Sequence, residues 1–220
     1  MFIIPFRSLT PVLQKSDHIF TQILSKSSSQ QNMVKKALVF LAPGAEEMEF
    51  VIAVDVLRRG GVDVTVAGIP DSNVVKCSRD VYIKPDIGVA QSSAKGPYDV
   101  VVLPGGLGGS KAMAESQEVG NILKNQECSG GLIAAICAAP TVLKAHGIAE
   151  GKELTSYPAM KAQLEEGGKY KYSECKVVVD GNLITSRGPG TAFDFALTVV
   201  DQLVGKDKAV EVAKAMLLDY

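Results

Sequence analysis

Cys137 lies where an apolar run gives way to a helical pattern, and a thiol in that position can act as a nucleophile. The run 131–136 is short, partly β-branched and preceded by glycines, which favours a strand that is buried on both faces. The stretch 138–145 predicts a helix, and the free N–H groups and macrodipole at a helix start favour a thiolate. The alternative is that Cys137 is a small buried apolar residue. This segment by itself does not decide between the two.

A cysteine nucleophile usually works with a histidine, but the chain has only two histidines. His18 lies near the start of the chain, and His146 is about 13 Å from Cys137 along a helix axis at 1.5 Å per residue. His146 is therefore expected to interact with carbonyl groups at the end of its helix. The proton chemistry is then left to a carboxylate.

Three glutamates near the start of a predicted helix are the candidate carboxylates. Glu46 and Glu47 suit exposed positions beside the helix amino terminus. Glu49 lies between Met48 and Phe50 and is expected to point toward the sheet. A desolvated carboxylic acid in that place keeps its proton near neutral pH and can hydrogen-bond a thiolate.

Strand and helix patterns alternate from residue 34 onward. This order predicts an α/β fold with a doubly wound, mostly parallel sheet between two layers of helices. Asp180-Gly181 predicts a hairpin turn. The expected strands are 36–42, 62–67, 98–103, 131–136 and 183–186, with an extended excursion at 74–83 and a small β-rich section at 153–156 and 172–179; the expected helices are 46–59, 116–126, 138–145, 191–203 and 207–217.

Four of these strands end in a turn that could form part of a site. Three of the turns are rich in glycine, and the fourth contains Cys137. Ligands of parallel sheets bind outside the carboxyl ends of the strands, so these four turns are expected to share one rim. Each glycine turn taken singly needs only a tight bend as its explanation. Their coincidence with a cysteine predicts a reactive site built from residues 43–49, 104–106, 137 and 187–189.

Composition limits the class of protein. A chain of 220 residues with 46% hydrophobic residues and no repeat predicts one globular domain, at 34–220. The net charge is -1 and no basic stripe is interleaved with aromatic residues, so nucleic acid is not an expected partner. Four cysteines without C-x-x-C spacing predict reduced thiols rather than a metal site. The longest apolar runs are too short to span a bilayer, so no membrane partner is expected.

Residues 1–33 differ from the rest of the chain. They are basic, rich in serine toward their end and almost free of acids, as in an organellar transit peptide, while the apolar start also resembles a weak secretory signal. Met33 can itself begin a complete domain, so a disordered tail or an alternative start is preferred to a working targeting signal. The expected location is the cytoplasm, with the nucleus as a second site and the mitochondrion if the extension does target the protein.

Six motifs, taken together, resemble those of the parkinsonism-associated deglycase family within the PfpI-like superfamily. They occur in the family's order over residues 34 to about 218. This resemblance implies a flavodoxin-like three-layer fold, a homodimer, and no metal or organic cofactor. The motifs are residues 37–39, 44–49, 77–80, 100–106, 134–138 and 185–191.

The resemblance also implies roles for individual residues. Cys137 matches the family's reactive cysteine and Glu49 its protonated glutamate neighbour. The backbone groups of Gly105, Gly106 and Ala138 match the family's oxyanion site. The remaining matches form the rim, where the family takes one arginine, here Arg79, from the dimer partner. The oxyanion residues are Gly105, Gly106 and Ala138, and the rim residues are Arg79, Tyr157, Arg187 and Pro189.

Two positions depart from the family pattern. Tyr157 stands where relatives carry a histidine near the cysteine, and Ala139 stands where they carry a glycine. A phenol donates a hydrogen bond but does not replace imidazole as a proton carrier near neutral pH. Activity that requires the histidine is therefore in question, and the methyl group of Ala139 is expected to narrow the turn.

The resemblance implies a glyoxalase- or deglycase-type hydrolase that protects against oxidative stress. Its substrates would be small α-oxoaldehydes, or proteins that carry early glycation adducts. The alternative is a redox sensor or chaperone-like stress protein, whose cysteine is oxidised to sulfinate without significant turnover. A protease or amidotransferase is the superfamily alternative, and the lack of a partner histidine counts against both.

Overall fold

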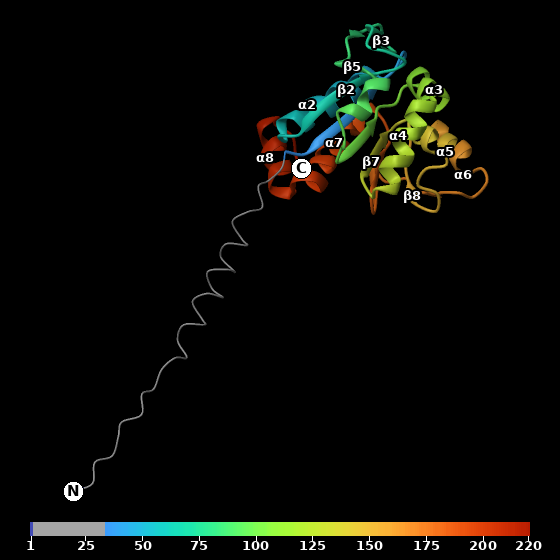
Figure 1. Ribbon diagram of the computed structural model, residues 1–220. Helices are drawn as coiled ribbons and strands as arrows, with labels where there is room; N and C mark the ends of the chain where they lie inside the picture. The colour runs from blue at the N-terminus through green and yellow to red at the C-terminus, as the bar shows by residue number, and fades with distance from the viewer. Residues whose placement is uncertain (2–33) are drawn as a thin grey trace. The chain divides into compact units, whose positions relative to one another are not determined.

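A seven-stranded sheet forms the centre of the computed structural model, which describes Met1 and residues 34–220 (Figure 1). Its strand order is β10-β11-β7-β6-β1-β2-β5, and every neighbouring pair is parallel except β10 and β11. The predicted mostly parallel sheet is therefore confirmed, as is the hairpin turn at Asp180-Gly181. The strands of the sheet are β1 (Lys36–Leu41), β2 (Asp63–Gly68), β5 (Ile87–Gly88), β6 (Val100–Leu103), β7 (Leu132–Ile136), β10 (Val177–Asp180) and β11 (Leu183–Ser186).

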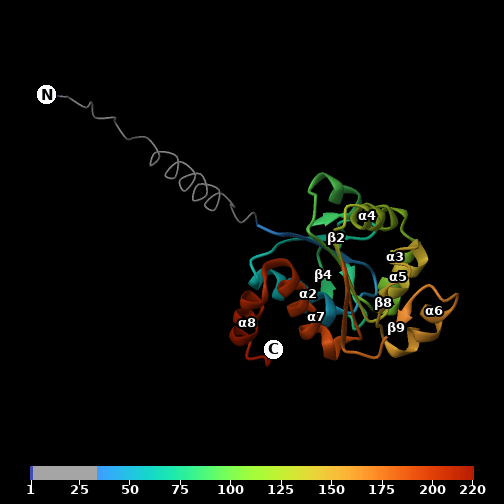
Figure 2. The ribbon, with the colours of Figure 1, turned by 90° about the horizontal axis from the view of Figure 1, so that it is seen from below.

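Helices cover both faces of the sheet, which gives the predicted three layers (Figure 2). One face carries α2 (Glu47–Arg59), α7 (Ala192–Val204) and α8 (Lys206–Ala215). The opposite face carries α3 (Leu107–Glu115), α4 (Gln117–Cys128) and α5 (Pro140–His146). The smaller elements are the hairpin β3 (Val75–Lys76) and β4 (Tyr82–Ile83), the parallel pair β8 (Glu153–Leu154) and β9 (Lys171–Tyr172), helix α6 (Lys161–Glu165), and the 3-10 segments η1 (Val89–Ala94), η2 (Pro158–Met160) and η3 (Pro189–Thr191).

Alternate residues of the central strands pack into two separate cores. In β1, Val39 packs on the side of α2 and α7, in a cluster that includes Phe195. Its neighbours Leu38 and Phe40 pack on the other side, in a cluster that includes Leu123 of α4. Because both faces are buried, the strand is apolar throughout rather than alternating, which is the pattern seen in the sequence.

Helix α3 was not predicted from the sequence, because glycines at 108 and 109 hide its helical pattern. The structure explains both glycines by a close approach of α3 to the loop after β1. A β-carbon on Gly108 would lie 3.1 Å from the Cα of Gly44, and one on Gly109 would lie 2.8 Å from the Cα of Ala45. The short helix α6 was not predicted either.

The predicted extension, residues 1–33, lies outside the described residues apart from Met1. Residues 34–220 form one compact unit. Among the described residues, no helix combines the length and the apolar character that crossing a bilayer requires.

Candidate active site at Cys137

The loops that follow β1, β6, β7 and β11 meet at one edge of the sheet, as the strand pattern predicts. They enclose a cavity of about 570 Å³, with the β3–β4 hairpin and the start of η2 completing its wall. This is a size typical of small-molecule sites. The lining residues are Gly44, Glu46, Ser78, Arg79, Gly106, Leu107, Gly108, Cys137, Ala138, Tyr157 and Pro189.

Cys137 forms a strained elbow between β7 and α5. Its φ is 64°, in the left-handed region that residues with a β-carbon seldom adopt, at a typical cost of about 1–3 kcal/mol. Two backbone hydrogen bonds hold this conformation: the N–H of Cys137 donates to Ser186 O at 3.0 Å, and Tyr157 N–H donates to Cys137 O at 2.8 Å. The side chain is 8% exposed and lines the cavity, so the thiol is largely buried but open to small molecules.

Glu49 is fully buried beside the thiol. Its Oε2 accepts a hydrogen bond from the N–H of Gly105 at 2.8 Å, while Oε1 has no hydrogen-bond partner among the described residues. No side chain fits at Gly105, because a β-carbon there would lie 2.6 Å from Cys137 Cβ and 2.7 Å from Glu49 Oε2. An unpartnered buried carboxyl oxygen next to a thiol suits a protonated acid that donates toward sulfur.

This position corrects the expectation for Gly105. The family resemblance grouped its backbone with the oxyanion site, but its N–H is already bonded to Glu49. Gly106 and Ala138 keep the expected arrangement, since their N–H groups donate toward the sulfur of Cys137. Gly106 has a φ of 83°, and a β-carbon there would lie 2.5 Å from Glu46 N, so only glycine fits.

The pKa values of both buried groups are raised. Burial raises the pKa of Glu49 to about 7, against the hydrogen bonds from Cys137 and Gly105. Burial and then the facing Glu49 carboxylate raise the pKa of the Cys137 thiol to about 12, against the N–H groups of Gly106 and Ala138. The sequence led us to expect a lowered thiol pKa, so the effect of the helix start is outweighed here by burial and by a carboxylate charge.

The two groups titrate as a pair, because the charge of each opposes ionisation of the other. Because burial raises the pKa of both groups, the pair keeps a single negative charge over a wide range of pH. When the remaining proton is on Glu49, the carboxylate charge disappears and the thiolate gains three donors, which are the carboxylic acid and two N–H groups. This form of the pair is the nucleophilic one.

The buried carboxylate of Glu47 holds Arg79 at the cavity. Glu47 was expected to be exposed, but it is buried, and its carboxylate accepts from Ser78 Oγ at 2.8 Å and from Arg79 N at 2.7 Å. These bonds fix the β3–β4 turn so that Arg79 lines the cavity of its own chain. The expectation that Arg79 reaches the site of a dimer partner stays a prediction.

Arg187 does not line the cavity, contrary to expectation. Its guanidinium donates to Glu174 O at 2.6 Å and pairs with Glu174 Oε2 at 2.8 Å, so its charge is engaged outside the cavity lining. Tyr157 and Pro189 do line the cavity, and Tyr157 is 46% exposed. A phenol thus lies in the cavity wall together with the thiol.

Glu46, one of the candidate carboxylates in the predicted rim segment 43–49, lines the cavity. It is the N-cap of α2, where its Oε2 accepts from Glu49 N at 2.8 Å. The signal for this cap was present in the sequence, as an acid three residues before Glu49 at a predicted helix start. His146 is remote, because its Nε2 contacts Met113 O at 3.0 Å. No group of three or more His, Cys, Asp or Glu side chains within the described part of the chain is arranged to hold a metal ion.

Comparisons with known proteins cover the elements that build this cavity. The sequence model of the DJ-1/PfpI family matches residues 35–202 of this chain. Protein dj-1beta of Drosophila melanogaster is 64% identical over 189 residues, which are 86% of this chain and 100% of the relative. The glutathione-independent glyoxalase DJR-1.2 of Caenorhabditis elegans is 45% identical over 185 residues, 84% of this chain and 97% of the relative. The crystal structure of Drosophila melanogaster DJ-1beta aligns with a TM-score of 0.83 and 63% identity, over 86% of this chain and 100% of that one.

Alkylation of Cys137 by iodoacetamide should report where the shared proton resides. If the proton that the pair retains lies on Glu49, the rate in the wild type rises with a midpoint near pH 7, where the pair loses its first proton. Glu49→Gln should raise this midpoint by about one pH unit or more, because an amide is a weaker donor than a carboxylic acid. Mass spectrometry of the Cys137 peptide measures both rates, and the exposed Cys128 is the internal reference. Faster alkylation of Glu49→Gln than of the wild type at pH 7 would place the charge on the carboxylate instead.

Proposed function

The chain belongs to the DJ-1/PfpI family, and from this membership we propose that it is a thiol-dependent enzyme that converts α-oxoaldehydes to hydroxy acids without a cofactor. A relative that is 45% identical is named as a glutathione-independent glyoxalase, which supports chemistry of this class. The observation that carries the proposal is the pairing of Cys137 with a fully buried Glu49, at the base of a cavity open to small molecules.

The first step is attack by the Cys137 thiolate on the aldehyde carbon of methylglyoxal, the probe substrate. A carbon–sulfur bond forms, and the carbonyl π electrons move to oxygen, which then takes up a proton to give a hemithioacetal. The N–H groups of Gly106 and Ala138 lie beside the sulfur and can stabilise the developing oxyanion. Glu49 holds a proton next to the sulfur and so sets how much thiolate is available.

The second step moves a proton from the hemithioacetal carbon to the neighbouring ketone carbon. The hemithioacetal loses the proton on its carbon and the proton on its hydroxyl group and becomes a thioester, while the neighbouring ketone gains one proton on carbon and one on oxygen and becomes an alcohol. One carbon is oxidised and the other reduced, so no external oxidant is needed. Glu49 does not line the cavity, and we therefore assign this transfer to a water molecule rather than directly to the carboxyl group.

Hydrolysis completes the cycle. Water attacks the thioester carbon, the carbon–sulfur bond breaks, and lactate leaves while the thiol is restored. Arg79 is a cation of the cavity wall, and we assign it to the carboxylate of the product. Early glycation adducts of proteins share the hemithioacetal chemistry of the first step, so they form the second substrate class of this proposal.

Purified protein should form lactate from methylglyoxal without glutathione, and Cys137→Ala should lower the rate by at least about 100-fold because the nucleophile is removed. Enzymatic lactate assay of the full chain measures this effect. Cys128→Ala is the matched control, since this exposed thiol lies outside the cavity and its loss should leave the rate unchanged. Equal lactate formation by wild type and Cys137→Ala would refute the proposal.

A second candidate function is redox sensing by the same cysteine. It is supported by the donors around the sulfur, because N–H groups and a carboxylic acid would also stabilise a sulfinate. One molecule of hydrogen peroxide oxidises the thiolate to sulfenate and is reduced to water, and a second converts the sulfenate to sulfinate. Turnover and sensing need the same ionised sulfur, so they are compatible.

Mild treatment with hydrogen peroxide should add two oxygen atoms to Cys137 before any other cysteine. The thiols of Cys128 and Cys175 are exposed and serve as references for simple accessibility, and Cys77 is buried, with burial raising its pKa to about 11. Intact-mass and peptide mass spectrometry measure the uptake at each position. Even oxidation of all four cysteines would count against a sensing role.

We also propose that the protein forms a homodimer through α2 and the β3–β4 hairpin. Large apolar side chains are exposed there, Met48 and Val51 on α2 and Val81 and Tyr82 around the hairpin. The two elements are joined at Glu47, so they present one continuous surface. Such a surface suits an isologous contact with a second copy.

Light scattering should therefore give twice the mass of one chain for the wild type. Val51→Glu should shift the protein toward the monomer, because it buries a charge at the proposed contact. Val210→Glu on α8 introduces the same charge at an exposed valine outside this surface and should leave the dimer intact. A monomeric wild type, or equal effects of the two substitutions, would contradict the proposed interface.

A further inference from the structure

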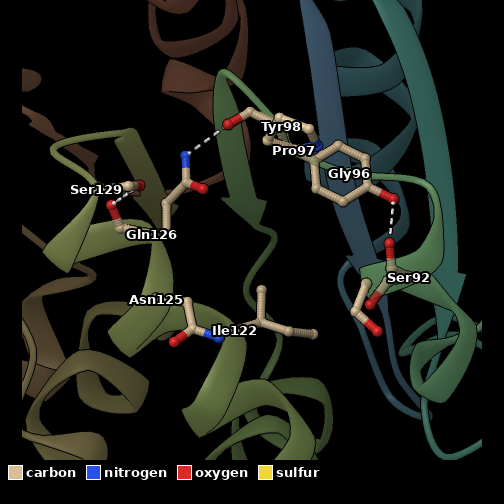
Figure 3. Close-up of a pocket in the computed structure, with 9 residues that line it drawn as sticks. Ser92, Gly96, Pro97, Tyr98, Ile122, Asn125, Gln126 and Ser129 are labelled. Atoms are coloured by element: carbon tan, nitrogen blue, oxygen red, sulfur yellow. Dashed lines mark hydrogen bonds between the residues drawn. The ribbon is translucent and has the colours of Figure 1, made fainter.

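A second cavity, of about 450 Å³, lies at the opposite edge of the sheet from Cys137 (Figure 3). Tyr98 precedes β6, and Ser129 lies between α4 and β7, so this cavity is at the amino ends of the strands whose carboxyl ends build the candidate active site. Figure 3 shows Ser92 and Tyr98 on one side and Ile122, Asn125 and Gln126 of α4 on the other. None of the residues of this cavity lines the cavity at Cys137.

The wall of the second cavity is uncharged. Pro97, Tyr98 and Ile122 supply apolar and aromatic surface, and the polar groups are hydroxyls and carboxamides. Because no charged side chain is present to compensate a ligand charge, an ionised ligand would lose its hydration without an ion partner. The lining therefore selects for neutral molecules. Its residues are Ser92, Ser93, Gly96, Pro97, Tyr98, Ile122, Asn125, Gln126 and Ser129.

Gln126 presents a fixed hydrogen-bond acceptor in this wall. The side chain is only 7% exposed, and its Nε2 donates to two backbone carbonyls, Tyr98 O at 3.2 Å and Leu132 O at 3.1 Å. Two carbonyl acceptors require both N–H groups of the amide, so the amide cannot be flipped. Its Oε1 receives no hydrogen bond from the described residues and is not one of the buried unpartnered atoms, so it is accessible to a donor from a ligand.

Asn125 and Ser93 add a second polar contact next to this acceptor. Both side chains are exposed at the cavity, and neither side chain is engaged in a hydrogen bond with the residues that the structure describes. The Asn125 amide offers N–H groups to a ligand carbonyl, while Gln126 Oε1 takes a ligand N–H. A flat ring fits the apolar surface of Pro97, Tyr98 and Ile122.

We propose that this cavity is a binding site for a small, neutral, planar molecule that carries an N–H donor beside a carbonyl, as in an aromatic amide. The ligand ring lies against Tyr98 and Ile122, and its N–H donates to Gln126 Oε1. The site is independent of the chemistry at Cys137, since the two cavities share no residue.

Benzamide is the probe for this site, in a titration of the full chain followed by backbone amide NMR shifts. We expect shifts confined to residues around Tyr98, Ile122 and Gln126, with a dissociation constant on the order of 1 mM for so small a ligand. N,N-dimethylbenzamide keeps the ring and carbonyl but has no N–H, and benzoate is ionised. Both should bind at least about 10-fold more weakly. The dimethyl analogue offers no N–H to Gln126 Oε1, and the carboxylate of benzoate has no cation in the cavity wall to pair with.

Protein variants test whether benzamide binds inside this cavity or elsewhere on the protein. Ile122→Trp should fill the cavity and abolish the shifts, whereas Ile122→Val keeps it open and should bind benzamide. Gly131→Ala should also weaken binding, because a β-carbon at that position would collide with Gln126 Nε2 and displace the amide. Cys137→Ala should bind as the wild type does. No shifts at about 20 mM benzamide, well above the expected dissociation constant, or equal binding of the dimethyl analogue would overturn the proposal.

Discussion

The burial of a carboxyl group against a thiol is the constraint on which the site depends. Glu49 is fully enclosed, receives one N–H from Gly105, and has no hydrogen-bond partner for its other oxygen among the described residues. Two negative charges cannot be accommodated there, and burial raises the pKa of both groups. The pair is thereby confined to one charge over a wide pH range, and the protein environment decides which atom carries it.

Backbone strain and close packing keep this pair together. Cys137 adopts a left-handed φ that two hydrogen bonds from neighbouring loops maintain, and Gly105 leaves no room for any side chain between the two groups. The same tight packing continues to α3, whose glycines allow its first turn to approach the loop after β1. A substitution at Gly105 would displace Cys137 and Glu49 directly, whereas one at Gly108 or Gly109 would act on them through the backbone of the loop after β1.

The parallel sheet separates two kinds of ligand environment. At its carboxyl edge the cavity combines a nucleophile with charged groups, Glu46 and Arg79, which suits polar carbonyl substrates and acidic products. At its amino edge the cavity has no charged wall and an oriented amide acceptor on Gln126. Tyr98 of the second cavity shortly precedes strand β6 and Gly106 of the first shortly follows it, so one strand connects the two sites.

The sequence by itself determined the layers of the fold, the rim on which the four turns meet, and the proximity of Cys137 to Glu49. These follow from local patterns, because apolar runs, glycine turns and the rule for parallel strands are written in short stretches of chain. Only the tertiary structure decided the direction of the thiol pKa, the use of the Gly105 N–H by Glu49, the burial of Glu47 and the pairing of Arg187 with Glu174. Each of these depends on which group lies within hydrogen-bond distance across more than ten residues of chain, and on how much water the packing excludes. No local pattern encodes those distances.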